Sequence, residues 1–170
     1  MTDDMDTGLH DAGPDALAPD AKADDKLAAM GKAPVFTPVD FDRLLERGLP
    51  QAHRAGIRTK EMGHGTITLT MPVSEDFLRP GGTVSGPTMF ALADVALYGA
   101  VLSMAGHIVL AVTSNMNITF LRRPPAKPLL AYARMVRMGR SLAYGEVTIH
   151  SEGEDDPVAH ATGTYAIPRG

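Results

Sequence analysis

The chain has 170 residues, the length of one domain, and its composition of 44% hydrophobic and 21% charged residues is ordinary for a globular protein. It contains no cysteine, which excludes disulfides, thiolate metal sites and a cysteine nucleophile. The formal net charge of −4, the absence of tryptophan and an aromatic content of 5% argue against a nucleic-acid binder.

The charge is unevenly distributed along the chain. Residues 1–40 hold nine acids and three lysines, whereas the rest holds eleven acids and thirteen bases, so the body is mildly basic. Residues 1–34 are rich in Asp, Ala, Gly and Pro, and we expect a disordered acidic tail there. With no secretory signal and no apolar run long enough to span a membrane, a cytoplasmic protein without a membrane partner is expected.

Residues 35–170 are predicted to form a single domain that begins with small elements. Asp40 is a plausible N-cap for a short helix that runs through Arg47. A strand is predicted over residues 53–60. Residues 66–71 alternate polar and apolar side chains and are rich in β-branched residues, which indicates a half-buried strand that ends at Pro72.

A long helix follows a glycine-rich loop. Pro87 is suited to the first turn of a helix, with Ser85 or Gly86 as its N-cap, and the helical pattern continues to Met104. Its apolar residues lie on all sides rather than on one stripe. Such a helix must be enclosed by other parts of the protein.

Four strands are predicted after this helix, over residues 107–121, 129–138, 141–151 and 157–167, and the short turns between them predict antiparallel hairpins. A single enclosed helix is best covered by a sheet that curls around it or by a partner chain. We therefore predict an α+β protein with the hotdog fold, a curled antiparallel sheet wrapped around one long central helix. Other α+β arrangements have the same number of elements.

Asp94 is the acidic residue that stands out in this helix. It is the one Asp, Glu, Lys, Arg or His between Gly81 and His107, and an unpaired buried carboxylate costs several kcal/mol or changes its protonation. It is either a structural acid that accepts hydrogen bonds from neighbouring chain, or a general base or nucleophile at the bottom of a cleft.

The loop before the helix favours the catalytic reading. Residues 81–86 bring flexible backbone to a helix N-terminus, where free N–H groups favour negative charge, as an oxyanion site requires. Gly86 and Pro87 lie about two turns before Asp94, so we expect them on the same helix face. In a dimer, the helix N-terminus of one subunit can also face Asp94 of the other.

Three segments resemble a known family, the hotdog-fold acyl-CoA thioesterases of the phenylacetate-pathway branch. That family reads roughly T-V-H-G-G, four residues, then L-x-D. The matching segments are TVSGPTMFALAD at residues 83–94, VTSNMNITFLR at residues 112–122 and ATGTY at residues 161–165. The resemblance covers about residues 50–168.

The resemblance implies hydrolysis of acyl-CoA thioesters. It places the base or nucleophile on Asp94 and the N–H that polarises the thioester carbonyl on Gly86. The polar side chain that orients the attacking water in some members corresponds to Thr113. The family pattern changes at Ser85, which replaces its histidine, at Pro87, which replaces its second glycine, and at Arg79, which replaces an asparagine.

Further polar residues are candidates for contact with the substrate. Arg122 and Arg140 lie at predicted strand ends, where they either contact the phosphates of CoA or are simply solvated. Asn115, on the same predicted strand face as Thr113, is grouped with the substrate-binding residues, as are Arg79, Ser85 and Pro87. The six histidines show no metal-ligand spacing, so we expect no metal and no cofactor apart from CoA as part of the substrate.

The predicted function is an acyl-CoA thioesterase that forms homodimers or, as dimers of dimers, homotetramers. The alternative is a protein of the same fold that binds an acyl-CoA or a small acid without hydrolysing it. The changed residues Arg79, Ser85 and Pro87 motivate this alternative.

Overall fold

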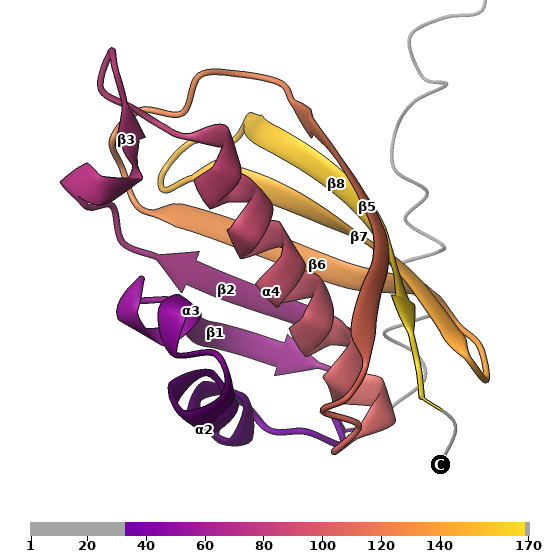
Figure 1. The fold of residues 1–170 in the computed structure, drawn as a ribbon. Coiled ribbons are helices and arrows are strands. Elements are labelled where there is room, and N and C mark those ends of the chain that lie inside the picture. The colour runs from indigo at the N-terminus through magenta and orange to yellow at the C-terminus, as the bar shows by residue number, and fades with distance from the viewer. Residues whose placement is uncertain (1–32, 169–170) are drawn as a thin grey trace, which may run out of the picture. The chain divides into compact units, whose positions relative to one another are not determined.

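The computed structural model describes residues 33–168, so the predicted tail lies almost wholly outside the described residues and stays a prediction. These described residues form two short helices, two strands, a short hairpin, one long helix and four further strands (Figure 1). These are α2 (Pro38–Gly48), α3 (Pro50–Arg54), β1 (Arg58–Gly63), β2 (Thr66–Met71), the hairpin β3 (Leu78–Arg79) and β4 (Thr83–Val84), α4 (Gly86–Ala105), β5 (Val112–Phe120), β6 (Leu129–Met138), β7 (Leu142–Ser151) and β8 (Pro157–Ala166).

Six strands form one antiparallel sheet in the order β1-β2-β6-β7-β8-β5. Helix α4 lies across one face of this sheet, and α2 and α3 lie beside it (Figure 1). One long central helix against a single antiparallel sheet is the hotdog fold, which confirms the predicted fold class. β1 and β5 are the two edge strands, and β5 directly follows α4 along the chain.

Helix α4 is held by its ends and by close packing on the sheet. The Ser85 hydroxyl accepts a hydrogen bond from the backbone N–H of Thr88, and Gly106 ends the helix at a φ of 74°, which suits glycine. Leu97 lies over two glycines of the sheet. A Cβ atom at Gly145 or Gly163 would come within 2.6 or 2.7 Å of its methyl groups, so glycine at both positions allows the helix to lie this close.

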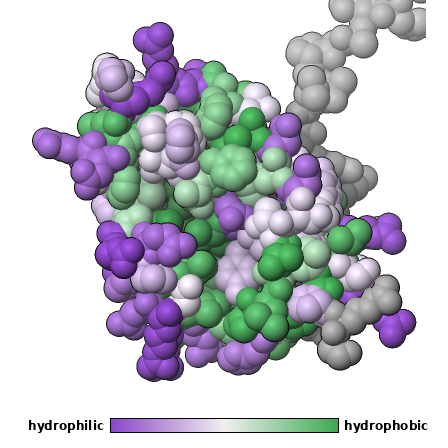
Figure 2. All heavy atoms as spheres, in the orientation of Figure 1, coloured by the Kyte–Doolittle hydropathy of each residue, from purple (hydrophilic) through white to green (hydrophobic). Residues whose placement is uncertain are grey.

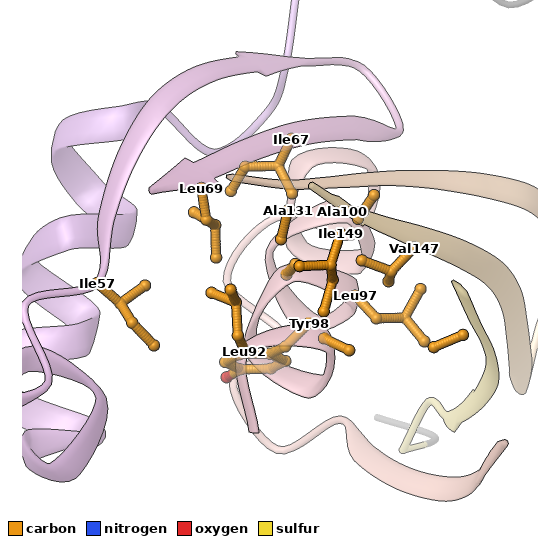
Figure 3. Packing of buried hydrophobic residues seen from close by; sticks show 14 of the residues in the cluster. Ile57, Ile67, Leu69, Leu92, Leu97, Tyr98, Ala100, Ala131, Val147 and Ile149 are labelled. Carbon is orange, nitrogen blue, oxygen red and sulfur yellow. The ribbon is translucent and has the colours of Figure 1, made fainter. Parts of the chain in front are cut away.

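The length and apolar composition of α4 would also suit a membrane span. Eleven of its residues, however, are buried inside this chain, and nine of them belong to its hydrophobic core. Leu92, Leu97 and Ala100 point into the same cluster as Leu69 and Ile149 of the sheet (Figure 3). The helix is the core helix of this fold.

The structure corrects the prediction for the first helix. Its N-cap is Thr37, and Asp40 is the third helical residue, whose carboxylate accepts a hydrogen bond from the Thr37 backbone in a capping box. Pro38 therefore occupies the first helical position, where it is favoured.

The predicted strand over residues 53–60 is partly wrong. Pro50 starts the one-and-a-half-turn helix α3, which contains residues 53 and 54, and Gly56 makes the turn out of it with a φ of 77°. The strand β1 begins only at Arg58. Between β2 and α4 the chain contains a 3-10 turn at Glu75–Phe77 and the β3–β4 hairpin.

Candidate functional site

Asp94 lines a cleft of about 820 Å³ between α2–α3, α4 and the start of β5. It is partly exposed, so within this single chain the side of α4 that faces the cleft is not enclosed, and its cover by a partner chain stays a prediction. Apolar side chains gather over this part of the molecule, between α3 and β5 (Figure 2). The apolar lining includes Leu44, Leu49, Ala52, Ala55, Ile57, Met71, Phe77, Ala91, Leu92, Val95 and Tyr98.

Two hydroxyl groups hold the carboxylate of Asp94 by the same oxygen. Thr113 Oγ1 and the Tyr165 hydroxyl each donate a hydrogen bond to Oδ1, both at 2.7 Å. Within residues 33–168, no Lys, Arg or His forms an ion pair with Asp94, and no group donates a hydrogen bond to its Oδ2. The carboxylate therefore presents an oxygen without a protein partner at an apolar cleft.

Tyr165 is a residue of the site that the sequence did not single out. It lies in the last matching segment, on β8, and is only 3% exposed. Its ring stacks on that of Tyr98, with centroids 5.9 Å apart. Burial and the negative charge of Asp94 raise the pKa of Tyr165 above its usual value, so the hydroxyl stays a neutral donor.

A β-bulge decides which residue of β5 reaches the cleft. The pairing of β5 with β8 shifts between Thr113 and Asn115, so Thr113 lies opposite the inward-facing Tyr165 and Asn115 opposite the outward-facing Thr164. The prediction that Thr113 and Asn115 share a face is therefore wrong. Thr113 lines the cleft, and Asn115 points to the other side of the sheet.

The N-terminus of α4 is built largely as predicted. Ser85 is the N-cap, and Met89 N–H donates to the Ser85 carbonyl. Among the described residues, the N–H of Gly86 has no hydrogen-bond acceptor. Pro87 lines the cleft, whereas Ser85 and Gly86 do not. The aromatic ring of Phe120, at the end of β5, lies 3.1 Å from the position of a Cβ on Gly86.

Gly86 and Asp94 are too far apart to act on one carbonyl within a single chain. The eight residues that separate them correspond to a rise of about 12 Å along the helix. A base and an oxyanion donor that act on one carbonyl must instead reach two atoms that are bonded to each other. The cleft is lined by residues 87, 88, 91, 92, 94, 95 and 98 of α4, so Pro87 shares this cleft with Asp94, whereas Gly86 is not among the lining residues.

The three candidate arginines do not contact Asp94. Arg79 Nε donates to Thr83 Oγ1 across the β3–β4 hairpin at 2.9 Å, and Arg122 forms an ion pair with Asp156 at 2.8 Å. Arg140 is exposed in the turn between β6 and β7. Residues 33–168 contain no cluster of three metal-ligating side chains, and the expected absence of a metal or cofactor remains an expectation.

Comparison with known proteins finds similarity over the part of the chain that contains this site. A family model described as the thioesterase superfamily matches residues 81–158, which include α4 and Asp94. A protein of Thermoplasma acidophilum named a "putative esterase" is 30% identical over 108 residues, 64% of this chain and 80% of that protein.

Solved structures resemble the whole described fold. A "putative thioesterase" from Silicibacter, known from its crystal structure, is 44% identical in sequence, with a TM-score of 0.75. The match covers 82% of this chain and 96% of that one. A mutant of the phenylacetic acid degradation protein PaaI from Thermus thermophilus is 28% identical, with a TM-score of 0.63, and covers 70% of this chain and 99% of that one.

Proposed function

The chain belongs to the thioesterase superfamily, and from that premise we propose that it hydrolyses acyl-CoA thioesters at the cleft that contains Asp94. The observation that carries the proposal is the carboxylate itself. It has no cationic partner among the described residues, and one of its oxygens has no donor, at the wall of an apolar cleft large enough for an acyl group.

In the proposed reaction, Asp94 acts as a general base on a water molecule. Oδ2 takes a proton from the water as its oxygen bonds to the thioester carbon, and the carbonyl oxygen becomes an oxyanion. An N–H at a helix start stabilises that oxyanion. When the intermediate collapses, the carbon–sulfur bond breaks, the proton on Asp94 passes to the sulfur of CoA, and the free acid leaves.

The oxyanion donor is proposed to come from a second copy of the chain. The Gly86 N–H is a free donor at the start of α4, but it lies about 12 Å of helix rise from Asp94 of its own chain. A partner that brings its own Gly86 against this Asp94 completes the site. One dimer then contains two equivalent sites.

Strand β5 supplies the surface for such a dimer. It is a nine-residue edge strand, most of whose side chains are exposed, and exposed apolar residues flank or occupy it, including Leu110, Val112, Phe120 and Leu121. An uncovered edge of this length is suited to pairing with another strand.

Antiparallel pairing of β5 with its partner places the two halves of the site together. Asp94 lies beside Thr113 at one end of β5, and Gly86 lies beside Phe120 at the other end. In a two-fold pair centred near the middle of the strand, the Thr113 end of one subunit meets the Phe120 end of its partner. We infer at least a homodimer, which further pairing can extend to a tetramer.

The same pairing suggests how CoA is held. Arg122 follows Phe120, so in the dimer it lies near the Asp94 of the partner, where it can contact a CoA phosphate once its exposed pair with Asp156 opens. Arg79, exposed on the hairpin before α4, lies near the same helix start. The acyl group is proposed to occupy the apolar cleft.

Binding without hydrolysis is the second candidate. Pro87 removes one N–H from the start of α4 and lines the cleft, which reduces the number of donors for an oxyanion. The two functions are separated by measuring both binding and release of CoA for acetyl-, octanoyl-, palmitoyl- and phenylacetyl-CoA. Release of CoA by the wild type and its loss in Asp94→Ala supports the enzyme, and tight binding without release supports the binding protein.

The composite site is tested with mixed dimers. Asp94→Asn removes the base, and Gly86→Pro removes the donor N–H, while Gly86→Ala keeps the N–H and controls for crowding against Phe120. A purified heterodimer of one Asp94→Asn chain and one Gly86→Pro chain has one intact site, so we expect about half of the wild-type activity, although both variant homodimers are inactive. A heterodimer as inactive as its parents would place the whole site within one chain.

A further inference from the structure

The Tyr165 hydroxyl is placed at the carboxylate of Asp94 by the core of the protein. It donates to Asp94 Oδ1 at 2.7 Å and lies 3.1 Å from the Asp94 backbone carbonyl oxygen. The two residues are 71 positions apart, one on α4 and the other on β8. The contact therefore joins the helix to the sheet at the point where the cleft begins.

The ring that carries this hydroxyl has little freedom to move. Tyr165 is almost fully buried, and its ring stacks on Tyr98, whose own hydroxyl donates to the Val109 carbonyl at 2.9 Å. The Tyr165 ring is thus fixed by burial and by its stack on Tyr98, which is itself anchored through its hydroxyl. Because a stacked, buried ring has few rotamers, the position of the donor is set before any substrate binds.

This fixed donor affects how the carboxylate of Asp94 is oriented. The terminal torsion of a free aspartate is broad and nearly two-fold, so its two oxygens ordinarily exchange places. Here both hydrogen bonds from neighbouring hydroxyls go to Oδ1, and Oδ2 receives none from residues 33–168. One oxygen is held, and the other is left for chemistry.

We propose that Tyr165 is a positioning residue that fixes Asp94 Oδ1 and thereby aims Oδ2 at the bound thioester. The proposal rests on the proposed function and names a residue that acts through Asp94, without touching the substrate. Thr113 donates to the same oxygen, but its short side chain is exposed within the chain, whereas the Tyr165 ring is buried in the core and stacked on Tyr98. Tyr165 is therefore the dominant donor of the two.

The test is Tyr165→Phe, which removes the hydroxyl and keeps the ring. Loss of alignment at a reacting group lowers the rate of the chemical step, so kcat is expected to fall about 10- to 100-fold while KM stays within about twofold. In an Asp94→Asn background the same substitution is expected to have no further effect, because the group that it positions is gone. An effect of equal size in both backgrounds would overturn the proposal.

Ser103→Ala is the matched control. Ser103 is fully buried on α4, accepts a hydrogen bond from Gly65 N–H and donates to the Ala100 carbonyl, so its loss removes a core hydroxyl away from the cleft. Its unfolding midpoint is expected to fall while its kcat stays within about twofold of the wild type. A loss of kcat as large as that of Tyr165→Phe would assign both losses to general destabilisation.

Thr113→Val removes the second donor to Asp94 Oδ1 and so tests whether Tyr165 is the residue that positions Asp94. This test does not depend on the stability of the Tyr165 variant. With Tyr165 in place, Oδ1 is still held, and a loss of kcat below about fivefold is expected. A larger loss than in Tyr165→Phe would transfer the positioning to Thr113. If the wild type itself releases no CoA, the proposed function fails; if it does and Tyr165→Phe keeps full kcat, only the positioning fails.

Discussion

Asp94 and Glu146 both accept hydrogen bonds from groups on other elements, but their surroundings are opposite. Asp94 lies at the apolar cleft and is held by the neutral hydroxyls of Thr113 and Tyr165. Glu146 lies on the outer face of the sheet, where Arg134 Nε is 2.5 Å from Oε1 and His160 Nε2 is 3.4 Å from Oε2.

The difference lies in the charge of the donors. A cation compensates the charge of the carboxylate that it contacts, so Glu146 is satisfied as part of a surface network. Neutral hydroxyls orient a carboxylate and leave its negative charge in place. Such a carboxylate, beside an apolar cleft, is the one able to accept a proton from water.

The largest expected effect is on catalysis. Asp94→Asn keeps the size of the side chain and removes its charge, so the loss of the general base should lower kcat by about 10² to 10⁴-fold. Glu146→Gln makes the same chemical change on the outer face and should leave kcat within about twofold. Steady-state release of CoA measures both, and equal losses in the two variants would remove the distinction between the carboxylates.

The two sides of α4 differ in their contribution to stability. Leu97 faces the sheet, is 1% exposed and packs on Gly145 and Gly163, so Leu97→Ala should lower the free energy of unfolding by about 2 to 5 kcal/mol. Val95 is partly exposed at the cleft, and Val95→Ala should cost about 1 kcal/mol or less while it changes the preferred acyl chain. Denaturant unfolding measures the stability of both variants, and hydrolysis of acyl-CoAs of increasing chain length measures the preference of Val95→Ala. Similar losses of stability in the two variants would contradict this difference between the sides of α4.

Tyr165 adds a dependence of stability on alkaline pH. An unfolded tyrosine ionises near pH 10, whereas the raised pKa of Tyr165 keeps it protonated in the folded state. Above about pH 10 the unfolded chain therefore binds fewer protons, and this residue makes the free energy of unfolding fall by about 1.4 kcal/mol per pH unit. Below that pH its contribution is fully present.

Tyr165→Phe should make the alkaline fall in stability shallower by that amount. Tyr98, whose pKa is also raised by burial, is present in both proteins and cancels in the difference. Urea unfolding between about pH 9 and pH 11 measures the slopes. Parallel slopes for the wild type and the variant would show that the hydroxyl is not held in its protonated form.

The smallest effect is expected from the surface network of Glu146. Its pair with Arg134 is partly exposed, so Glu146→Gln should lower the free energy of unfolding by about 1 kcal/mol or less, and the difference should shrink at high salt. Thermal unfolding at two salt concentrations checks this. A loss of several kcal/mol in the free energy of unfolding that persists at high salt would mean that this network is a major source of stability for the sheet.

Much of the fold could be predicted from the sequence because its signals are local. The alternation in residues 66–71 and the turn residues around residues 129–138 depend only on neighbouring side chains, and both strands are observed over those residues. The start of α4 was predicted from Ser85 and Pro87 in the same way. The short helix α3 was missed, although Pro50 is a start signal, because five residues are too few for a helical pattern.

The candidate site could be predicted only in part. Asp94 is conspicuous because it is an acid in an apolar helix, and Thr113 followed from the family resemblance. Tyr165 was missed because it contacts Asp94 across 71 residues of chain, which no local pattern records. The separation of Thr113 from Asn115 was missed because a bulge depends on the register with a partner strand.

The central claim is that Asp94 Oδ2 activates the water that attacks a thioester bound in the cleft. A crystal structure with a non-hydrolysable ketone analogue of an acyl-CoA tests it most directly. We expect the acyl chain in the apolar cleft, and a water within about 2.6–3.2 Å of Oδ2 and about 3–3.5 Å of the ketone carbon. An analogue whose carbonyl lies away from both copies of Asp94, or an Asp94 paired with a cation in the assembled protein, would contradict it.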